Sequence, residues 1–374
     1  MGDFDSQAIS AQEVEEHDND DWETQSAKLD QRIDAYYSTG AISDLADAIE
    51  AAETLDDLTQ QEHLRSHRLE ILDTLYGMTH QKYCKTRSLA DLDVVIRFAE
   101  RAIRETPDTD PFKADRIGRL GQVLILKSDH TARLSDLDEA ISVLHQGMEV
   151  VSDNNHTCRA SLLSDLGSSL SNRHKLTGNM DELDNATRFA REALDLTDEN
   201  DTQFSGRLTN LGNRIWSRYL LNASLEDLEE AIEVARRALC VRPIVLHGLS
   251  DRFNNFAVRL GERYARKGAQ EDIDKALEMC HYSIEASEEG SVEWADRQYT
   301  LGSLLHRRYS RSHNIKHLDE AIAAETKAVE AAPEDNLTKA RYLNTLGSRH
   351  GERYPLTKAK SDLGNAIRLT KKAL

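Results

Sequence analysis

The chain has 374 residues, 6% of them aromatic, and a formal net charge of −19. This acidity disfavours binding to nucleic-acid backbones and to anionic membrane surfaces, so we expect neither nucleic acid nor membrane as a partner. No apolar run approaches the roughly 20 residues of a membrane-spanning helix, and no apolar signal segment opens the chain, which favours a cytoplasmic protein.

The N-terminal segment 1–28 has no hydrophobic periodicity and holds nine acidic residues against one lysine. Such a composition predicts an acidic, disordered tail. Trp22 lies inside it, and either docks onto the first repeat or stays in a loose tail, which we favour. Met1-Gly2 opens a bare myristoylation pattern, but the acidic residues behind it argue against membrane attachment.

From residue 29 to 374 a block of about 45 residues recurs eight times. Its marker is an acidic residue followed by Leu or Ile and, three positions later, by a small residue. The apolar residues of the marker are 45 to 47 positions apart. They are Leu45, Leu92, Leu137, Leu183, Leu228, Ile273, Leu318 and Leu363. Such regularity is typical of a repeat array rather than of a globular enzyme core.

Each block predicts two helices joined by a short turn. In the block from Ser205, the apolar residues of the first helix are spaced three, four and four apart: Leu208, Leu211, Ile215 and Tyr219. Ser224, three residues before Asp227, predicts a capped start for the second helix. The second helix repeats the helical spacing with Leu228, Ala231, Ile232, Ala235 and Ala238. Pro243 would close the block, because proline cannot continue a helix.

A Leu-Gly pair recurs in the first helices, with its glycine at 121, 167, 212, 302 and 347. Each glycine stands 19 residues before an alanine of the second helix. A glycine inside a helix costs about 1 kcal/mol relative to alanine, so its recurrence predicts a close crossing of the two helices, with Gly facing a small residue. The first helices also end in basic-aromatic pairs such as Arg218-Tyr219, where we expect the Tyr to extend the apolar face and its hydroxyl to reach a loop.

The Leu-Gly pair, two alanines seven apart and a following proline resemble the tetratricopeptide repeat. Ala231, Ala238 and Pro243 keep this spacing, and so do Ala321, Ala328 and Pro333. The unit is longer than the usual 34 residues. In this it resembles long tetratricopeptide arrays of large fungal proteins, often associated with a CHAT peptidase or a nucleotide-binding signalling module. The resemblance implies an all-α solenoid, a right-handed superhelix of about eight helix-turn-helix repeats.

Catalytic and metal-binding patterns are scarce. The sequence contains no P-loop, no dinucleotide-binding glycine pattern, no G-x-S-x-G and no HExxH. His63 and His67 are four apart but have no nearby third ligand. Four scattered cysteines form no CxxC pair, which favours reduced thiols. We therefore expect no cofactor, no metal and no enzymatic activity.

In tetratricopeptide arrays the first helices line a concave groove that binds ligands. The positions equivalent to that groove lie three before the recurring glycine and one, four and five after it. Among them we predict binding residues that combine amides, aromatic rings and charged groups: Asn213, Trp216, Asn254, Glu262, Tyr299, His306, Arg307 and Asn344. The known clamp for chaperone C-termini needs a lysine where this chain has Thr209, which disfavours that ligand.

The leading hypothesis is a non-catalytic scaffold or sensor that binds a protein or peptide segment in the groove, or restrains an effector domain C-terminal to this chain. A second hypothesis is an enzyme that uses the solenoid cavity, with Arg214, Glu262, His306, Arg307 and Tyr299 as candidate groups. A third is self-assembly through the C-terminal end, because the last alanine stripe stops at Ala373-Leu374 without a polar capping helix.

Overall fold

A computed structural model describes residues 3–59, 64, 67–242, 246, 248–334 and 337–373, with side chains from residue 21 onward. The described residues form sixteen α-helices and no strand. The predicted all-α, repeated helix-turn-helix fold is therefore confirmed. The handedness of the predicted superhelix stays a prediction.

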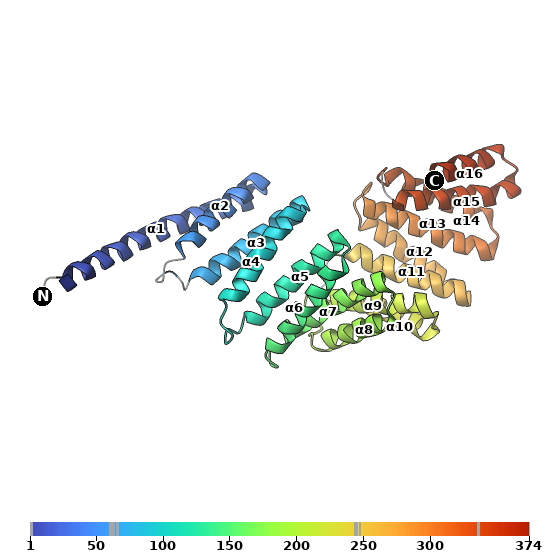
Figure 1. Ribbon diagram of the computed structural model, residues 1–374. Helices are drawn as coiled ribbons and strands as arrows, with labels where there is room; N and C mark the ends of the chain where they lie inside the picture. The colour runs from blue at the N-terminus through green and yellow to red at the C-terminus, as the bar shows by residue number, and fades with distance from the viewer. Residues whose placement is uncertain are drawn as a thin grey trace. The chain divides into compact units, whose positions relative to one another are not determined.

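The chain divides into two compact units, Met1–Leu196 and Thr197–Leu374. In unit 1 the helices form four pairs (Figure 1). They are α1 (Asp3–Thr39) with α2 (Ile42–Leu58), α3 (Arg68–Thr86) with α4 (Leu89–Glu105), α5 (Lys113–Thr131) with α6 (Leu134–Val150), and α7 (His156–Thr177) with α8 (Met180–Asp195).

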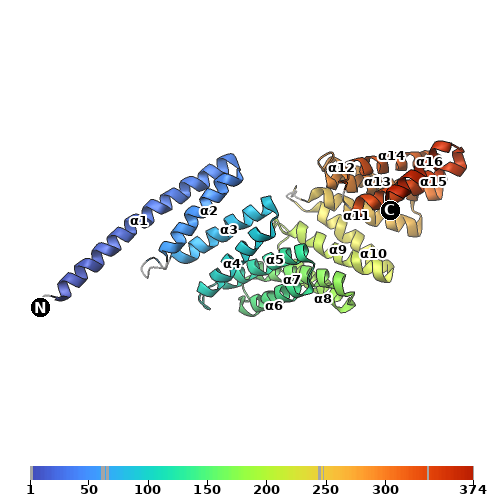
Figure 2. The same cartoon turned by 45° about the horizontal axis from the view of Figure 1, so that its top comes forward.

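Unit 2 repeats the arrangement four times, and within it each pair packs against the next in serial order (Figure 2). Its pairs are α9 (Phe204–Asn222) with α10 (Leu225–Cys240), α11 (Leu249–Lys267) with α12 (Gln270–Glu285), α13 (Val292–Ser312) with α14 (Ile315–Ala331), and α15 (Leu337–Thr357) with α16 (Lys360–Ala373). We call the odd-numbered member of each pair its first helix and the even-numbered member its second helix.

The core follows the helical spacing of the apolar residues. The predicted second-helix residues of the block from Ser205 are all buried, and Leu228 and Ala231 have no exposed surface. The Ser224 hydroxyl accepts a hydrogen bond from the backbone N–H of Asp227, so the predicted capped start of α10 is confirmed. Pro243 lies outside the described residues.

The recurring glycines do mark close helix crossings. A Cβ at Gly302 would lie 3.1 Å from the backbone oxygen of Ala321, the predicted small residue, and would clash with the side chain of Glu325. At Gly212 the closest neighbour belongs to the next repeat: a Cβ there would lie 3.0 Å from Nη1 of Arg259 on α11. The predicted small residue faces the glycine at Gly302 and Gly347, whereas Gly121 meets the side chain of Leu144 and Gly212 those of Arg259 and Val234.

The turn inside most pairs contains a polar link that was not predicted. In the last turn of the first helix a Thr or Asn bonds to the marker acid five residues later, as in Thr86–Asp91, Thr177–Glu182 and Asn222–Asp227. The same side chain accepts a hydrogen bond from the backbone two residues on. Because side chain and backbone are both satisfied, the link sets where one helix ends and the next begins. In α11–α12 this position is Lys267, which bonds to Glu229 instead.

The basic residue of the basic-aromatic pair completes this link. Arg218 donates to both carboxylate oxygens of Asp227, at 3.0 and 2.5 Å, and Arg263 does the same with Asp272, at 2.9 and 2.6 Å. In the pair α13–α14 the marker acid is replaced by His317, and Ser312 bonds to its ring instead. The Tyr hydroxyls differ from expectation, because that of Tyr219 reaches the next first helix rather than a loop.

At the N-terminus, α1 continues through residue 28, so no change of secondary structure marks the predicted boundary between tail and array. The division into 1–28 and 29–374 stays a prediction. Trp22 is half-buried against the cluster around Leu29 and Leu45, with its ring 4.8 Å from that of His67. Trp22 therefore docks onto the first repeat, the alternative that we had not favoured.

At the other end, α16 exposes apolar residues that the preceding second helices bury. Leu363 is 42% exposed, whereas its equivalents Leu318, Ile273 and Leu228 have no exposed surface. Ile367 is 51% exposed, although its equivalent Ile322 is buried. Within unit 2 the earlier second helices α10, α12 and α14 each pack against the first helix of the pair that follows, which explains the difference. Over the described residues, none of the helices combines the length and hydropathy that crossing a membrane requires.

Candidate functional site

The predicted binding residues lie on one surface of unit 2, which we call the first-helix face: the surface formed by α9, α11, α13 and α15. Neighbouring first helices contact each other directly, through hydrogen bonds between residues 42 to 47 positions apart. Each such bond links one repeat to the next. The face is therefore a continuous surface made from separate repeats.

Asn213 lies where α9 meets α11. Its side-chain oxygen accepts hydrogen bonds from Nη2 of Arg259, at 2.8 Å, and from Nδ2 of Asn255, at 3.2 Å. These two donors orient the amide, so the Asn213 NH₂ group is available as a donor at the exposed surface. One turn further, Trp216 is half-buried, with its ring 5.0 Å from that of Tyr219.

Glu262 on α11 forms hydrogen bonds with side chains of both neighbouring first helices, α9 and α13. It accepts hydrogen bonds from the Tyr219 hydroxyl, at 2.8 Å, and from Nη1 of Arg307, at 2.7 Å. Burial alone would raise the pKa of Glu262, but the bonds from Arg307 and Tyr219 outweigh it and lower the pKa. Arg266 lies over the Tyr219 ring and donates to its hydroxyl. This cluster is a structural link with its charges already paired.

Tyr299 and His306, both on α13, contact α15 at separate points. The Tyr299 ring stacks on that of Tyr342 with centroids 4.6 Å apart, and its hydroxyl lies 3.4 Å from that of Thr345. His306 Nε2 is 2.8 Å from a carboxylate oxygen of Glu352. Burial and nearby Arg349 lower the pKa of His306 despite that carboxylate, which favours the neutral ring at pH 7.

The two remaining predicted residues differ in exposure. Asn254 is half-buried, and its side-chain oxygen has no hydrogen-bond partner among the described residues. Asn344 is exposed on α15. The structure thus brings Glu262 and Arg307 into contact, whereas Asn213, Tyr299 and His306 each have other partners.

A row of buried cations on the first helices was not predicted. Arg207, Arg252 and Arg297 stand 45 residues apart, five before the glycine position, and each is at most 7% exposed. Arg297 donates to the Ser250 hydroxyl at 3.1 Å and pairs with Asp251, both on the preceding first helix. The constant spacing of 45 residues could have shown that the arginine recurs, but not that it is buried.

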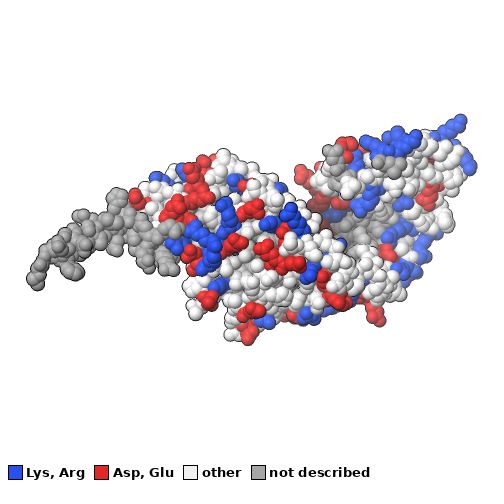
Figure 3. Space-filling view, in the orientation of Figure 1, with Lys and Arg blue, Asp and Glu red and all other residues white. Residues whose placement is uncertain are grey.

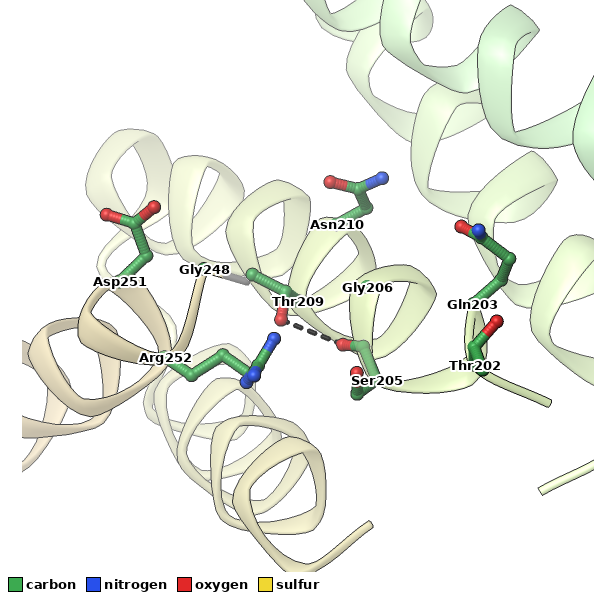
Figure 4. Close-up of a pocket in the computed structure, with 9 residues that line it drawn as sticks. All are labelled: Thr202, Gln203, Ser205, Gly206, Thr209, Asn210, Gly248, Asp251 and Arg252. Atoms are coloured by element: carbon green, nitrogen blue, oxygen red, sulfur yellow. Dashed lines mark hydrogen bonds between the residues drawn. The ribbon is translucent and has the colours of Figure 1, made fainter. Parts of the chain in front are cut away.

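Between the N-terminal halves of α9 and α11 lies a hollow of about 420 Å³ (Figure 4). Arg252 points from α11 toward Ser205 and Thr209 on α9, and the Thr209 hydroxyl bonds to the Ser205 carbonyl at 2.9 Å. The Ser205 hydroxyl is buried and has no hydrogen-bond partner among the described residues. The wall is thus polar, with Asn210 beside Thr209.

The net negative charge resides entirely in unit 1. Residues 1–196 hold 20 Lys and Arg against 39 Asp and Glu, whereas residues 197–374 hold 27 of each. Figure 3 shows basic and acidic side chains interspersed over the visible part of unit 1. The acidity that disfavours anionic partners for the whole chain therefore does not apply to unit 2.

The side chains offer little for metal or nucleophilic chemistry. Among the described residues, no group of three or more His, Cys, Asp or Glu could hold a metal ion. His63, one of the two histidines with a metal-binding spacing, lies outside the described residues. Burial raises the pKa of the Cys158 and Cys280 thiols to about 12, which keeps both protonated and unreactive.

One repeat matches a known family. Residues 206–239, which span α9 and most of α10, match the tetratricopeptide repeat. No curated protein matches the chain. The match covers the block whose helices and cap were predicted from spacing above.

Several solved structures are similar in fold at low sequence identity. The C-terminal part of a TPR repeat-containing protein from Cytophaga hutchinsonii is 15% identical, over 86% of this chain and 99% of that one, with a TM-score of 0.49. The RpL4 assembly chaperone Acl4 is 18% identical, over 78% and 99%, also at 0.49. The S. pombe nuclear import adaptor Nro1 is 17% identical, over 73% and 97%, at 0.43. At these values the likenesses carry no argument about function.

Proposed function

We propose that the protein is a non-catalytic interaction module that binds an extended protein segment on the first-helix face of unit 2. The observation that carries this proposal is the distribution of charge on that face. Glu262 and Arg307 pair with each other, and His306 meets Glu352. Apart from the carboxylate of Glu352, what these positions offer to a partner is amides, hydroxyls and aromatic rings.

This chemistry suits a peptide backbone. An extended segment presents alternating N–H and C=O groups, and an amide side chain can both donate and accept. Asn213 has a donor available and Asn344 is exposed on the last first helix, while Trp216 and Tyr299 supply rigid apolar surface. Because repeats link through their first helices, the array would hold these groups at fixed separations.

The cavity-enzyme hypothesis receives less support. Glu262, His306 and Tyr299 each contact a different partner, and Arg214 is buried. The groups that the sequence offered for catalysis are therefore distributed along the face rather than gathered around one reacting atom. We include a cytoplasmic location in the proposal, because all four cysteines are free thiols.

Selection of random twelve-residue peptides displayed on phage against the full chain tests this function. Enriched peptides should lose at least tenfold in affinity for the double variant W216A/H306A, since both removed rings would line the bound segment. Circular dichroism melting should show that this variant remains folded.

The double variant H281A/Y282A is the matched control, because it removes a histidine and a half-exposed aromatic residue from α12. It should bind the selected peptides as the unchanged protein does. Equal losses in both double variants, or no enriched peptide at all, would reject the first-helix face as the binding surface.

A second candidate function rests on the exposed row Leu363 and Ile367 of α16. Self-assembly of two copies through this row would bury it. An effector module C-terminal to residue 374, such as a CHAT peptidase or a nucleotide-binding module, would bury it equally. Light scattering distinguishes the two alternatives. A mass that rises with protein concentration and falls to that of the monomer in L363E/I367E supports self-assembly. A constant monomer mass rejects it.

A further inference from the structure

The buried guanidinium of Arg259 has no carboxylate partner among the described residues. Arg259 is 1% exposed, and it donates hydrogen bonds to the Asn213 side-chain oxygen at 2.8 Å and to the Ala231 carbonyl at 3.4 Å. Its Nε has no hydrogen-bond partner within the part of the chain that the structure describes. Burial lowers the pKa of Arg259 to about 10 with no acidic group opposing the shift, so the group stays charged at pH 7.

The same position two repeats later shows what is missing. Arg349 is two residues after the glycine position, as Arg259 is, and it pairs with the buried carboxylate of Glu325 at 3.2 Å. Glu325 stands 23 residues after Gly302, and the residue 23 after Gly212 is Ala235. One repeat junction thus supplies an internal counter-ion, and the other has a methyl group in its place.

Asn213 connects the buried charge of Arg259 to the exposed surface by a hydrogen bond. The guanidinium bonds to the amide oxygen, which polarises the amide and strengthens its NH₂ group as a donor. Asn213 is exposed, and Asn255 beside it donates to the same oxygen. A bound anion would therefore meet amide donors backed by a buried positive charge. Unit 2 carries no net charge that would repel it.

We propose that the junction of α9 and α11 binds an acidic side chain of the partner segment, an aspartate or glutamate, through Asn213 and the charge of Arg259. This inference rests on the proposed function and names the partner's chemistry at one position. A hydrogen bond from an amide to a carboxylate is stronger than one to an uncharged amide oxygen, and a nearby buried positive charge adds to this difference. The site should thus prefer glutamate to glutamine by on the order of tenfold.

The test uses the full chain and three blocked or partly blocked seven-residue peptides. The first has a central glutamate, the second a central glutamine, and the third a central alanine with a free C-terminal carboxylate. Binding is followed by nuclear magnetic resonance through the side-chain NH₂ signals of Asn213, which are identified by their loss in N213S. We expect the glutamate peptide to bind about tenfold more tightly than the glutamine peptide and more tightly than the free-carboxylate peptide.

A235E supplies the internal carboxylate that Glu325 supplies elsewhere, and A235Q adds the same volume without the charge. Burial raises the pKa of the equivalent Glu325 to about 7, so the comparison is made at pH 8, where such a carboxyl is ionised. The preference for glutamate should then disappear in A235E and persist in A235Q. If A235E does not fold, R259M provides the same comparison, because it removes the charge and keeps an unbranched side chain.

Equal binding of the glutamate and glutamine peptides overturns the inference, and so does a glutamate preference that survives in A235E or R259M. Tighter binding of the free-carboxylate peptide would overturn the assignment to a side chain. Peptides selected by phage could still bind the first-helix face in each of these cases. Failure here is therefore distinguishable from failure of the proposed function.

Discussion

At the scale of single residues, the crossing at Gly302 leaves no room for a side chain. A Cβ there would meet the Ala321 carbonyl and the Glu325 side chain. Gly302→Ala should lower the free energy of unfolding by about 2 kcal/mol, because overpacking outweighs the gain in helix propensity. Urea denaturation followed by circular dichroism measures the change.

Gly364 is the control for this substitution, because it also lies inside a helix but a Cβ there would have nothing within 4 Å. Gly364→Ala should raise the free energy of unfolding by up to about 1 kcal/mol. If both variants gained stability, the close crossing at Gly302 would be wrong.

Glu325 makes the stability depend on pH. Burial raises the pKa of its carboxyl from 4.5 to about 7, against the opposing charge of Arg349. Between those values the folded state binds more protons at this site than the unfolded state, so its contribution to stability decreases as pH rises from about 4.5 to 7. The decrease should amount to about 1–3 kcal/mol.

The measurement compares the unchanged protein with Glu325→Gln across this pH range, because other carboxylates titrate in both. The difference in unfolding free energy between the two should shift in favour of the variant as pH rises. A difference that stays constant from pH 4.5 to 7 would show that Glu325 is ionised throughout.

At the scale of elements, the link between marker acid, Arg and Asn joins the two helices of the pair α9–α10. Asp227 is 6% exposed and accepts hydrogen bonds from both Arg218 and Asn222. Asp227→Ala should destabilise the protein by about 2–3 kcal/mol, because the partly buried Arg218 guanidinium loses its two short bonds to the carboxylate and keeps the longer contact with Glu230 at 3.9 Å.

Glu233→Ala on the same helix removes an ion pair with Arg236 whose two side chains are both half exposed. This change should cost less than about 0.5 kcal/mol. Similar losses in the two variants, measured by thermal unfolding, would mean that the link in the turn contributes no more than a surface ion pair.

The elements themselves were largely predictable, and their links only in part. Spacings of three and four placed both helices of the block from Ser205, and Ser224 marked the start of the second. The link from Asn222 to Asp227 was not predicted, because the sequence places Asn222 in the turn without showing which side chain there faces the marker acid. The burial of Arg252 and Arg297 was equally hidden, since it depends on how closely successive first helices approach.

At the scale of the whole molecule, the repeat predicted the architecture but not the chemistry of its surface. Glu262, Arg307 and His306 were correctly placed on first helices, yet their partners lie 45 or 46 residues away in the next repeat. To predict such contacts one must know which residues of neighbouring repeats lie opposite each other. A sequence period near 45 defines this alignment only to within a few residues. The counter-ion missing at Arg259 could be recognised only by comparing two junctions in space.

The central claim is that partners bind the first-helix face of unit 2, and hydrogen–deuterium exchange tests it most directly. Saturating the full chain with a phage-selected peptide should slow amide exchange in α9, α11, α13 and α15 and leave α10, α12 and α14 unchanged. Protection confined to the second helices, or to unit 1, would contradict the account.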